Sequence, residues 1–323
     1  MSLEYRMHTK EDLPEMARLW SEHTGWGEFN WDASGRSLLR SPYGESFVSL
    51  AIDKDTGEIA GQFVFIPSRV VVDCREIAAL RPFAPIMSKR YRGSLENPFT
   101  HPVMGMYQCA VKALRKQGFQ LLYSLPDPRW RRVFAVVPWL QVGSFPLYSL
   151  PLPLEAPLEL GTEFSASPLD EFTEELDRLW RTASRQHPCV VRRDAPVLRW
   201  KKGDDDHVLG IRRRGELVGT VMSVQKGDRQ WLISDVLAAD SEASLRATLA
   251  AAGNLAHTMS QQPDLPKPII KVAVLTTPFM ERQVRALGFR RDDYDFLLVI
   301  HVLDRSLPKD IVDPSRWYVG ASD

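Results

Sequence analysis

The stretch "SKRYRGSLENPFTHPVMGMY", residues 88–107, decides how the rest of the chain is interpreted. Clustered cations and a glycine come first, two prolines follow, and the end of the stretch has the pattern of a helix. Lys89, Arg90 and Arg92 stand immediately before Gly93. Main-chain N–H groups at a glycine turn and a helix N-terminus form an anion site, so the stretch suits a phosphate-bearing ligand. A solvated basic turn would explain the same residues equally well.

The composition is that of an ordinary globular protein. Among 323 residues, Lys and Arg number 41, Asp and Glu also number 41, and 44% of the residues are hydrophobic. This length predicts two domains, and zero net charge gives no support to binding of DNA or of an anionic membrane surface. Three scattered cysteines make no disulfide framework and fit a reducing cytosol. We therefore expect a cytoplasmic protein without a signal peptide or a membrane span.

Before the basic stretch, the pattern predicts one helix and then antiparallel strands. Apolar residues recur at helical spacing within residues 13–20. The sequence "KDTG", residues 54–57, is typical of a hairpin turn between two strands. Residues 76–86 form a further predicted strand, and Pro82 and Pro85 indicate that it is bent or bulged near its end.

After the basic stretch, the pattern predicts a helix closed by Gly118 and then a buried strand. A segment rich in proline follows, which places a domain boundary near residue 156. The second half repeats the order of helix, antiparallel strands, helix, strand, short helix and strand, at a period of roughly 150 residues. The predicted fold class is α/β (α+β), with tandem domains at residues 1–155 and 156–323. Each domain is expected to have a mixed, mostly antiparallel sheet, a splayed parallel pair and flanking helices.

This order of elements, with a basic glycine loop before the main helix, resembles the GNAT (N-acetyltransferase-like) acyltransferase superfamily over nearly the whole chain. The sequence "MSKRYRG" looks like the family's pyrophosphate-binding motif, which usually reads Arg/Gln-x-x-Gly-x-Gly/Ala. Arg90 and Gly93 match its first two fixed positions, and Leu95 stands at the third. The ending "RWYVGASD", residues 316–323, also resembles that of two-domain tandem members.

The resemblance implies an N-acyltransferase that moves an acyl group from acyl-CoA, acetyl or longer, to an amine of a small molecule, without a metal. It implies that main-chain N–H groups at a strand bulge stabilise the oxyanion, and that the loop binds the pyrophosphate. The cofactor-binding residues implied are Ala84, Ile86, Arg90, Arg92, Gly93 and Ser94. The second half has an acidic loop with Asp240 and Glu242 at the corresponding place, which would repel a pyrophosphate. We expect the second domain to shape the acceptor pocket or to bind a different ligand.

Three kinds of side chain are candidates for proton transfer. Asp127 follows the strand after the main helix and could act as a base or orient the amine, or it could simply cap a turn. His101 suits proton transfer near neutral pH, or it could be a surface histidine beside a helix N-terminus. Tyr107, Tyr123 and Tyr148 could protonate the leaving thiolate, although Tyr107 and Tyr123 also stand where core aromatics are expected. The sequence shows no ligand spacing for a metal.

A second basic stretch follows the start of the second half. It comprises Arg192, Arg193, Arg199, Lys201 and Lys202, with Trp200 among them. These cations could bind an anionic acceptor or a carrier protein that presents the acyl group. They could equally form the solvated face of a helix and balance the acidic residues 203–206.

Three functions therefore remain open at this point. The first is an acyl-CoA-dependent N-acyltransferase acting on a small amine. The second is a transferase of the same fold that uses an acyl or peptidyl carrier protein, or an aminoacyl-tRNA. The third is a binding protein that has the fold but no catalytic activity.

Overall fold

The computed structural model describes residues 2–25, 27–30, 35–92, 100–227, 229–239, 241–263, 265 and 267–323. The chain divides into two compact units, each with its own core. Unit 1 comprises Met1–Val70, Glu76–Gly143 and Leu297–Val312. Unit 2 comprises Val71–Arg75, Ser144–Phe296 and Asp313–Asp323.

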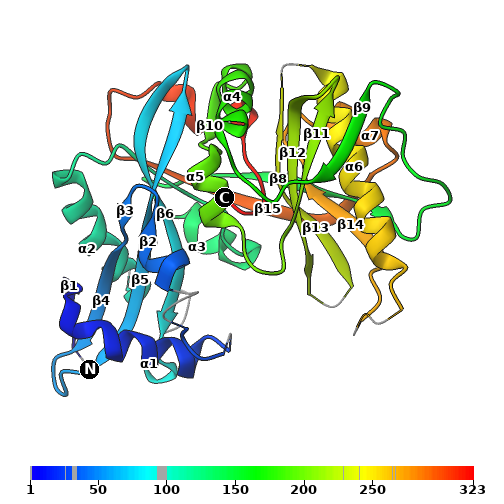
Figure 1. The fold of residues 1–323 in the computed structure, drawn as a ribbon. Helices are drawn as coiled ribbons and strands as arrows, with labels where there is room; N and C mark the ends of the chain where they lie inside the picture. The colour runs from blue at the N-terminus through cyan, green and yellow to red at the C-terminus, as the bar shows by residue number, and fades with distance from the viewer. Residues whose placement is uncertain are drawn as a thin grey trace. The chain divides into compact units, whose positions relative to one another are not determined.

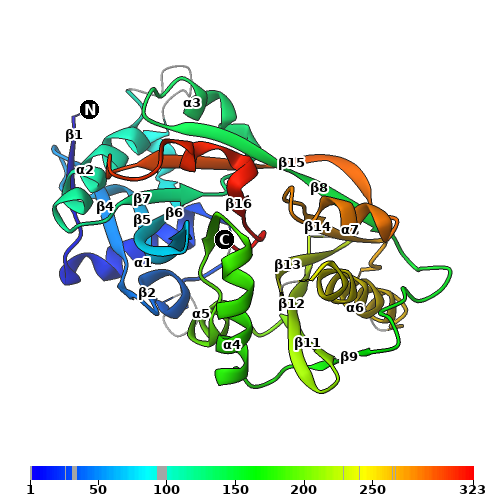
Figure 2. The same ribbon diagram turned by 90° about the horizontal axis from the view of Figure 1, so that it is seen from above.

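Unit 1 has a mostly antiparallel sheet in the order β1-β4-β5-β6-β7-β15 (Figure 1; β7 is labelled in Figure 2). Its strands are β1 (Leu3–Met7), β4 (Phe47–Asp53), β5 (Ile59–Val72), β6 (Arg75–Met87), β7 (Leu121–Ser124) and the end of β15 (Arg290–Val302). A separate hairpin is formed by β2 (Arg40–Ser41) and β3 (Gly44–Glu45). The α-helices are α1 (Leu13–His23), α2 (Pro102–Lys116) and α3 (Arg131–Ala135). Shorter helical turns are Lys10–Asp12, Gly35–Leu39, Lys89–Tyr91, Pro128–Trp130 and Lys309–Val312.

The core of unit 1 forms where apolar helix faces meet the sheet. α1 buries Met16, Leu19 and Trp20, which share one face at helical spacing. α2 packs beside β1 and β4 and buries the face that contains Met104 and Leu114. The helix positions predicted from the sequence are therefore confirmed for this unit.

The two parallel strands of unit 1 stay together only briefly. β6 and β7 pair at Ala79↔Leu121 and Leu80↔Leu122, while β6 continues to Met87. Within this continuation, Ala84 has a φ of 47°, in the left-handed region that non-glycine residues rarely adopt. The distortion predicted from the nearby prolines is thus present, and it lies where the two strands have parted.

Unit 2 repeats the design with the sheet order β8-β14-β13-β12-β11-β9. Its strands are β8 (Gln141–Pro151), β9 (Phe164–Pro168), β10 (Cys189–Val191), β11 (His207–Arg213), β12 (Glu216–Lys226), β13 (Gln230–Ala238), β14 (Lys271–Leu275) and β16 (Trp317–Tyr318). The α-helices are α4 (Glu174–Ala183), α5 (Ala195–Lys201), α6 (Glu242–Ser260) and α7 (Glu281–Ala286), and helical turns lie at Ser184–Gln186 and Pro314–Arg316. Figure 2 shows α6 nearly end-on beside β12 and β13, and its main sheet contacts are with β11, β12 and β13.

The units are not continuous stretches of sequence, and this differs from the predicted boundary near residue 156. β8 comes from the first half but pairs with β14 of unit 2, for example at Lys271↔Pro151. The end of β15 comes from the second half but pairs with β7 of unit 1, for example at Val299↔Ser124. Because the order of elements along the chain does not say which sheet a strand joins, this exchange could not be predicted from the sequence.

The predicted fold class is confirmed. Each unit has a mostly antiparallel sheet that contains a parallel pair, β6–β7 in unit 1 and β13–β14 in unit 2, and helices pack on the sheet. In unit 2, the short strands β10 and β16 also pair in parallel. Within the described residues, no helix is long and apolar enough to span a bilayer.

Candidate active site

A cleft opens in unit 1 where β6 extends beyond its pairing with β7. Its volume is about 370 Å³. It is lined by His23, Thr24, Ala84, Pro85, Ile86, Met87, Arg92, His101, Val103 and Trp130. The wall therefore combines the end of β6, the first turn of α2, the end of α1 and the turn after β7. Four residues predicted from the sequence meet here: Ala84, Ile86, Arg92 and His101.

Ala84 is the distorted point of the cleft wall. A left-handed backbone at a non-glycine residue costs on the order of 1–3 kcal/mol and persists only where the surroundings hold it. Strain of this kind gathers at functional sites, because it turns main-chain groups out of the regular ladder. The position suits the oxyanion donors predicted around Ala84 and Ile86, although their role in binding stays a prediction.

Arg92 connects two parts of the wall. Its Nε donates to the carbonyl of Met87 at 3.1 Å, and its Nη2 donates to the carbonyl of His23 at 2.9 Å. Because a guanidinium has five N–H donors, others remain for an anion. The guanidinium of Arg90 instead lies 5.4 Å from the ring centre of Tyr91. Gly93 and Ser94, the other predicted loop ligands, and Leu95 lie outside the described residues.

His101 is not the surface histidine of the second alternative, and its role in proton transfer stays a prediction. It is the N-cap residue of α2, and its Nδ1 accepts the N–H of Val103 at 3.2 Å. Its side chain is buried rather than on the surface, and burial lowers its pKa. The ring meets Trp130 edge to face, at 6.3 Å between centres. A neutral imidazole whose Nδ1 accepts a hydrogen bond carries its proton on Nε2, so His101 can offer a donor to the cleft.

Asp127 is placed as a turn cap. It accepts the N–H of Arg129 at 2.9 Å, and both of its oxygens accept from the Arg129 guanidinium, at 2.9 and 2.8 Å. These bonds hold the pKa of the Asp127 carboxyl below its usual range, although the group is exposed. Asp127 is not among the residues that line the cleft. The turn-capping alternative accounts for its geometry.

Tyr107 lies in the core of unit 1 and is not part of the cleft wall. Its hydroxyl hydrogen-bonds to Nδ1 of His301 at 2.9 Å, and its ring packs near Phe63 and Phe65. Burial raises the pKa of Tyr107 and lowers that of His301 to about 4. The arrangement accounts for Tyr107 as a core residue, and the structure does not bring it together with the other candidates.

Six residues of the wall were not predicted as site residues: His23, Thr24, Pro85, Met87, Val103 and Trp130. His23 is the last residue of α1, and its Nδ1 is buried without a hydrogen-bond partner in the described part of the chain. Burial is the main cause that lowers its pKa, which favours the neutral form of the ring. No local pattern marks His23, because only the tertiary structure brings the end of α1 to the end of β6.

Unit 2 has the same parting of strands, but there it is filled. β13 and β14 pair from Gln230↔Lys271 to Ile233↔Val274, and β13 then continues without β14 while it stays paired with β12 on its other side. The C-terminal tail, residues 317–323, lies along this continuation: the N–H of Ser322 donates to the Ser234 carbonyl at 3.0 Å. A Cβ added to Gly320 would lie 2.8 Å from the same carbonyl oxygen, so the approach requires glycine there.

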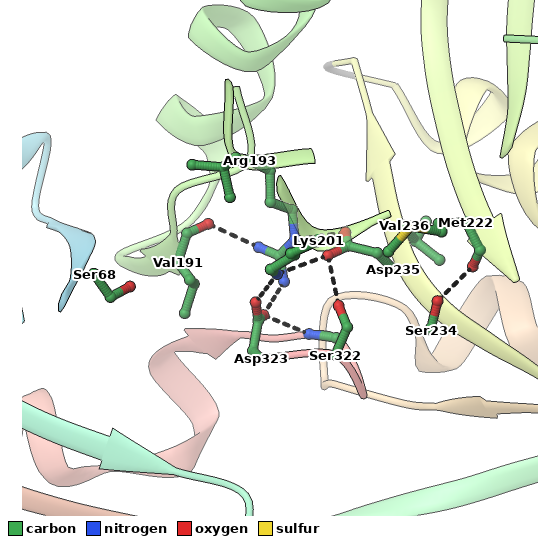
Figure 3. A network of polar contacts seen from close by, with 12 residues as sticks. Ser68, Val191, Arg193, Lys201, Met222, Ser234, Asp235, Val236, Ser322 and Asp323 are labelled. Carbon is green, nitrogen blue, oxygen red and sulfur yellow. Dashed lines mark hydrogen bonds and ion pairs between the residues drawn. The ribbon is translucent and has the colours of Figure 1, made fainter. Parts of the chain in front are cut away.

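Buried charges anchor this tail (Figure 3). Arg193, which is fully buried, donates from Nε to Asp235 at 2.7 Å and from Nη2 to Asp323. Lys201 bridges the same two carboxylates, at 3.1 Å to Asp235. Burial would raise the pKa of Asp323, but the attraction of Arg193 and Lys201 outweighs it and lowers the pKa. The second basic stretch was expected either to bind an anionic acceptor or carrier protein, or to form a solvated helix face. For Arg193 and Lys201 both alternatives are wrong, because these side chains are buried and paired with Asp235 and Asp323.

A metal centre is not evident among the described residues, since no group of three or more His, Cys, Asp and Glu side chains is arranged to hold an ion. The polar groups of the cleft are instead main-chain groups and the side chains of two histidines, an arginine, a threonine and a tryptophan. Such a set can orient a thioester, donate to an oxyanion and accept a proton.

Comparison with known proteins identifies the fold. No family model and no curated protein sequence matches the chain. Among solved structures, a GCN5-related N-acetyltransferase from Anabaena variabilis aligns with a TM-score of 0.70 and 10% identity, over 94% of this chain and 73% of that one. N-myristoyltransferase from Saccharomyces cerevisiae, solved with myristoyl-CoA, gives 0.59 and 12% identity, over 94% and 79%. A tandem GNAT protein from the clavulanic acid biosynthesis pathway gives 0.58 and 14%, over 95% and 100%.

Proposed function

We propose that this tandem GNAT-fold protein transfers an acyl group from an acyl-CoA thioester to the amine of a small molecule, and that unit 1 performs the reaction. One observation carries the proposal: unit 1 has an open cleft between two parting parallel strands, beside the N-terminus of α2 and an arginine. The similar structures include acyltransferases, one of them with myristoyl-CoA bound. Because the identities are low, they support the fold and leave the substrates to experiment.

In the proposed site, acyl-CoA binds at the end of β6 and the start of α2. The dipole of α2 favours negative charge at the start of the helix. Main-chain donors are few there, because Pro102 has no N–H and the N–H groups of Val103 and Met104 already donate to His101. Arg92 stands on the same wall, and Arg90 borders a neighbouring surface depression with Arg92. These groups would hold the pyrophosphate, so that the thioester lies along β6 near Ala84.

The proposed reaction needs a proton acceptor and an oxyanion donor. The amine nitrogen attacks the thioester carbon, a C–N bond forms, the C–S bond breaks, and the amine proton leaves while the thiolate takes one up. Main-chain N–H groups around Ala84 and Ile86, together with Nε2–H of His101, would stabilise the charge on the carbonyl oxygen. We propose His23 as the base, because it is neutral and lies on the wall of the cleft.

Binding is the first test. Calorimetric titration with acetyl-, octanoyl- and palmitoyl-CoA should show saturable binding of at least one of them. Arg90→Glu should weaken it about tenfold, the effect of some 1.4 kcal/mol, because the new carboxylate repels the phosphates. Arg246→Glu, on the exposed side of α6 in unit 2, is the matched control and should bind normally. If none of the three acyl-CoAs binds, the proposal fails.

Transfer is the second test. Release of CoA thiol should be followed with a panel of small amines. His23→Gln should lower kcat and flatten the pH profile between pH 5 and 8, while leaving the affinity for acyl-CoA nearly unchanged. Binding of acyl-CoA without transfer to any amine would instead favour a binding protein that has lost catalysis. A role of unit 2 in shaping the acceptor pocket stays a prediction.

A further inference from the structure

Charge is distributed very unevenly between corresponding parts of the two units. Residues 88–135 of unit 1, from the end of β6 to the end of α3, contain nine Lys and Arg but two Asp and Glu. The corresponding residues 239–286 of unit 2 contain five Lys and Arg and four Asp and Glu. The whole chain has no net charge, so the excess belongs to the elements that frame the cleft of unit 1.

The cations of the two units also differ in their partners. In unit 2, Lys271 pairs with Asp292, Arg282 with Glu242 and Arg285 with Glu281, so the segment is largely neutralised. In unit 1, the outer side of α2 carries a group that we call the α2 basic face: Lys112, Arg115 and Lys116. All three are exposed, and among the described residues no carboxylate forms an ion pair with any of them.

The α2 basic face is too far along the helix to act on a pyrophosphate at its start. Lys112 lies ten residues beyond Pro102, which is about 15 Å at 1.5 Å per residue. Charges in solvent are largely screened beyond about 8 Å at physiological ionic strength. Spacing of three and four residues places the three side chains on one side of the helix. Arg115 and Lys116 also suit the negative end of the helix dipole, but Lys112 lies before the last turn.

The α2 basic face is continuous with the surroundings of the cleft. One depression beside α2 is lined by Arg90, Arg92 and Thr100, and the next by Thr100, His101 and Lys112. Both depressions also share Tyr5, whose ring lies against α2 at Gly105. An acidic surface could therefore contact Lys112 and its neighbours while a flexible arm reaches past His101 into the cleft.

We infer that the α2 basic face docks an acidic carrier protein, which presents its acyl group on a phosphopantetheine thioester to the cleft of unit 1. The inference rests on the proposed function, because the arm delivers the same thioester chemistry to the same site. The acceptor amine forms the C–N bond, the C–S bond of the arm breaks, and the carrier leaves with a free thiol. Charge complementarity gives such an encounter its rate and its specificity.

The experiment compares two donors on one set of variants. Octanoyl groups are supplied either on CoA or on a purified acidic acyl-carrier protein, and kcat/KM is measured with each. The triple variant Lys112→Glu, Arg115→Glu, Lys116→Glu should lower kcat/KM for the carrier donor tenfold or more and leave that for octanoyl-CoA within about threefold. The Gln versions of the three substitutions should lower kcat/KM for the carrier donor less than the Glu versions do. Added salt should lower kcat/KM for the carrier donor most in the wild type.

A matched control reverses three exposed arginines of unit 2: Arg178→Glu, Arg181→Glu and Arg185→Glu. It makes the same change in net charge and should leave both donors unaffected. An equal loss with both donors, no loss with either, or no use of the carrier would overturn the docking inference while octanoyl-CoA transfer still supports the proposed function. If neither donor is used by the wild type, the proposed function fails as well. Circular dichroism of each variant confirms that it is folded.

Discussion

The two clefts of this protein differ in what they contain. In unit 1, β6 and β7 part beyond Leu80, and the cleft that Ala84 lines there is open. In unit 2, β13 and β14 part beyond Ile233, and the C-terminal tail lies along the edge of β13 that β14 has left. The same parting of parallel strands can therefore serve a ligand or a segment of the chain itself. The difference between the two clefts is whether a segment of the chain hydrogen-bonds to the main-chain groups that the strands expose where they part.

The anchor of the tail gives the largest expected effect. Arg193→Met leaves Asp235 and Asp323 buried with Lys201 as their remaining cation. Removing one member of a buried ion network costs about 3–5 kcal/mol, because an uncompensated charge stays buried. Chemical denaturation, with hydrogen exchange read separately on peptides of each unit, should show the loss in unit 2. Arg178→Met, an exposed counterpart on α4, should change stability little. A loss confined to unit 1 would contradict this account of the tail.

Acid should lower the stability of both units, but over different ranges of pH. Burial lowers the pKa of His301 in unit 1 to about 4, beside Tyr107 and Arg115, and that of His187 in unit 2 to about 3, beside Arg193. Below pH 6.5 an unfolded histidine binds a proton that the folded one does not, so stability is complete above this pH and falls as the pH falls. For His301 the loss is about 3 kcal/mol, complete near pH 4.

Hydrogen exchange at a series of pH values measures these losses in each unit. His301→Asn should flatten the profile of unit 1 and leave that of unit 2 unchanged, whereas His187→Asn should do the reverse. If the two variants alter both profiles alike, the two histidines do not report on separate units.

Gly320→Val tests the close contact of the tail. The added Cβ meets the main-chain carbonyl of Ser234, which cannot move aside as a side chain would. Overpacking of this kind costs about 1–3 kcal/mol, so the tail should leave the groove and become sensitive to proteases. Gly35→Ala in unit 1 is a control, since its Cβ would meet nothing within 4 Å. A tail that stays protected in the valine variant would show that the contact is not needed.

Filling the open cleft should have a smaller effect on stability but a clear one on binding. Val103 lies in the first turn of α2 and lines the cleft. Val103→Phe should lower the affinity for acyl-CoA about tenfold, some 1.4 kcal/mol, when measured by calorimetry. Leu245→Phe, in the first turn of α6 in unit 2, should leave the affinity unchanged. Equal losses in both variants would mean that the difference between the clefts is not what controls binding.

The strained residue of the open cleft gives the smallest effect. Ala84→Gly removes the Cβ that disfavours a φ of 47°, and should raise stability by about 1 kcal/mol if the backbone keeps its course. Ala238→Gly, near the end of β13, lacks this strain and should be neutral or destabilising. Thermal unfolding compares the two variants, and a destabilised Ala84→Gly would argue against strain at this position.

Much of the site could be predicted because its signals are local. Pro82 and Pro85 mark a strand that cannot continue regularly, and the distortion lies between them at Ala84. Arg92 and His101 stand on either side of the loop that leads into α2, so any strand–loop–helix arrangement brings them near the end of β6. Asp127 and Tyr107 were ambiguous for the same local reason, because a turn cap and a core tyrosine look like catalytic residues in sequence.

The sequence by itself determined the helices, the strands, their repeated order and the excess of cations around α2, since periodicity, turn residues and charge are properties of short stretches. Only the tertiary structure decided that β8 and β15 exchange sheets, that His23 reaches the cleft, and that Arg193 and Lys201 are buried with Asp323. These depend on contacts between residues far apart in the chain, for which no local pattern exists.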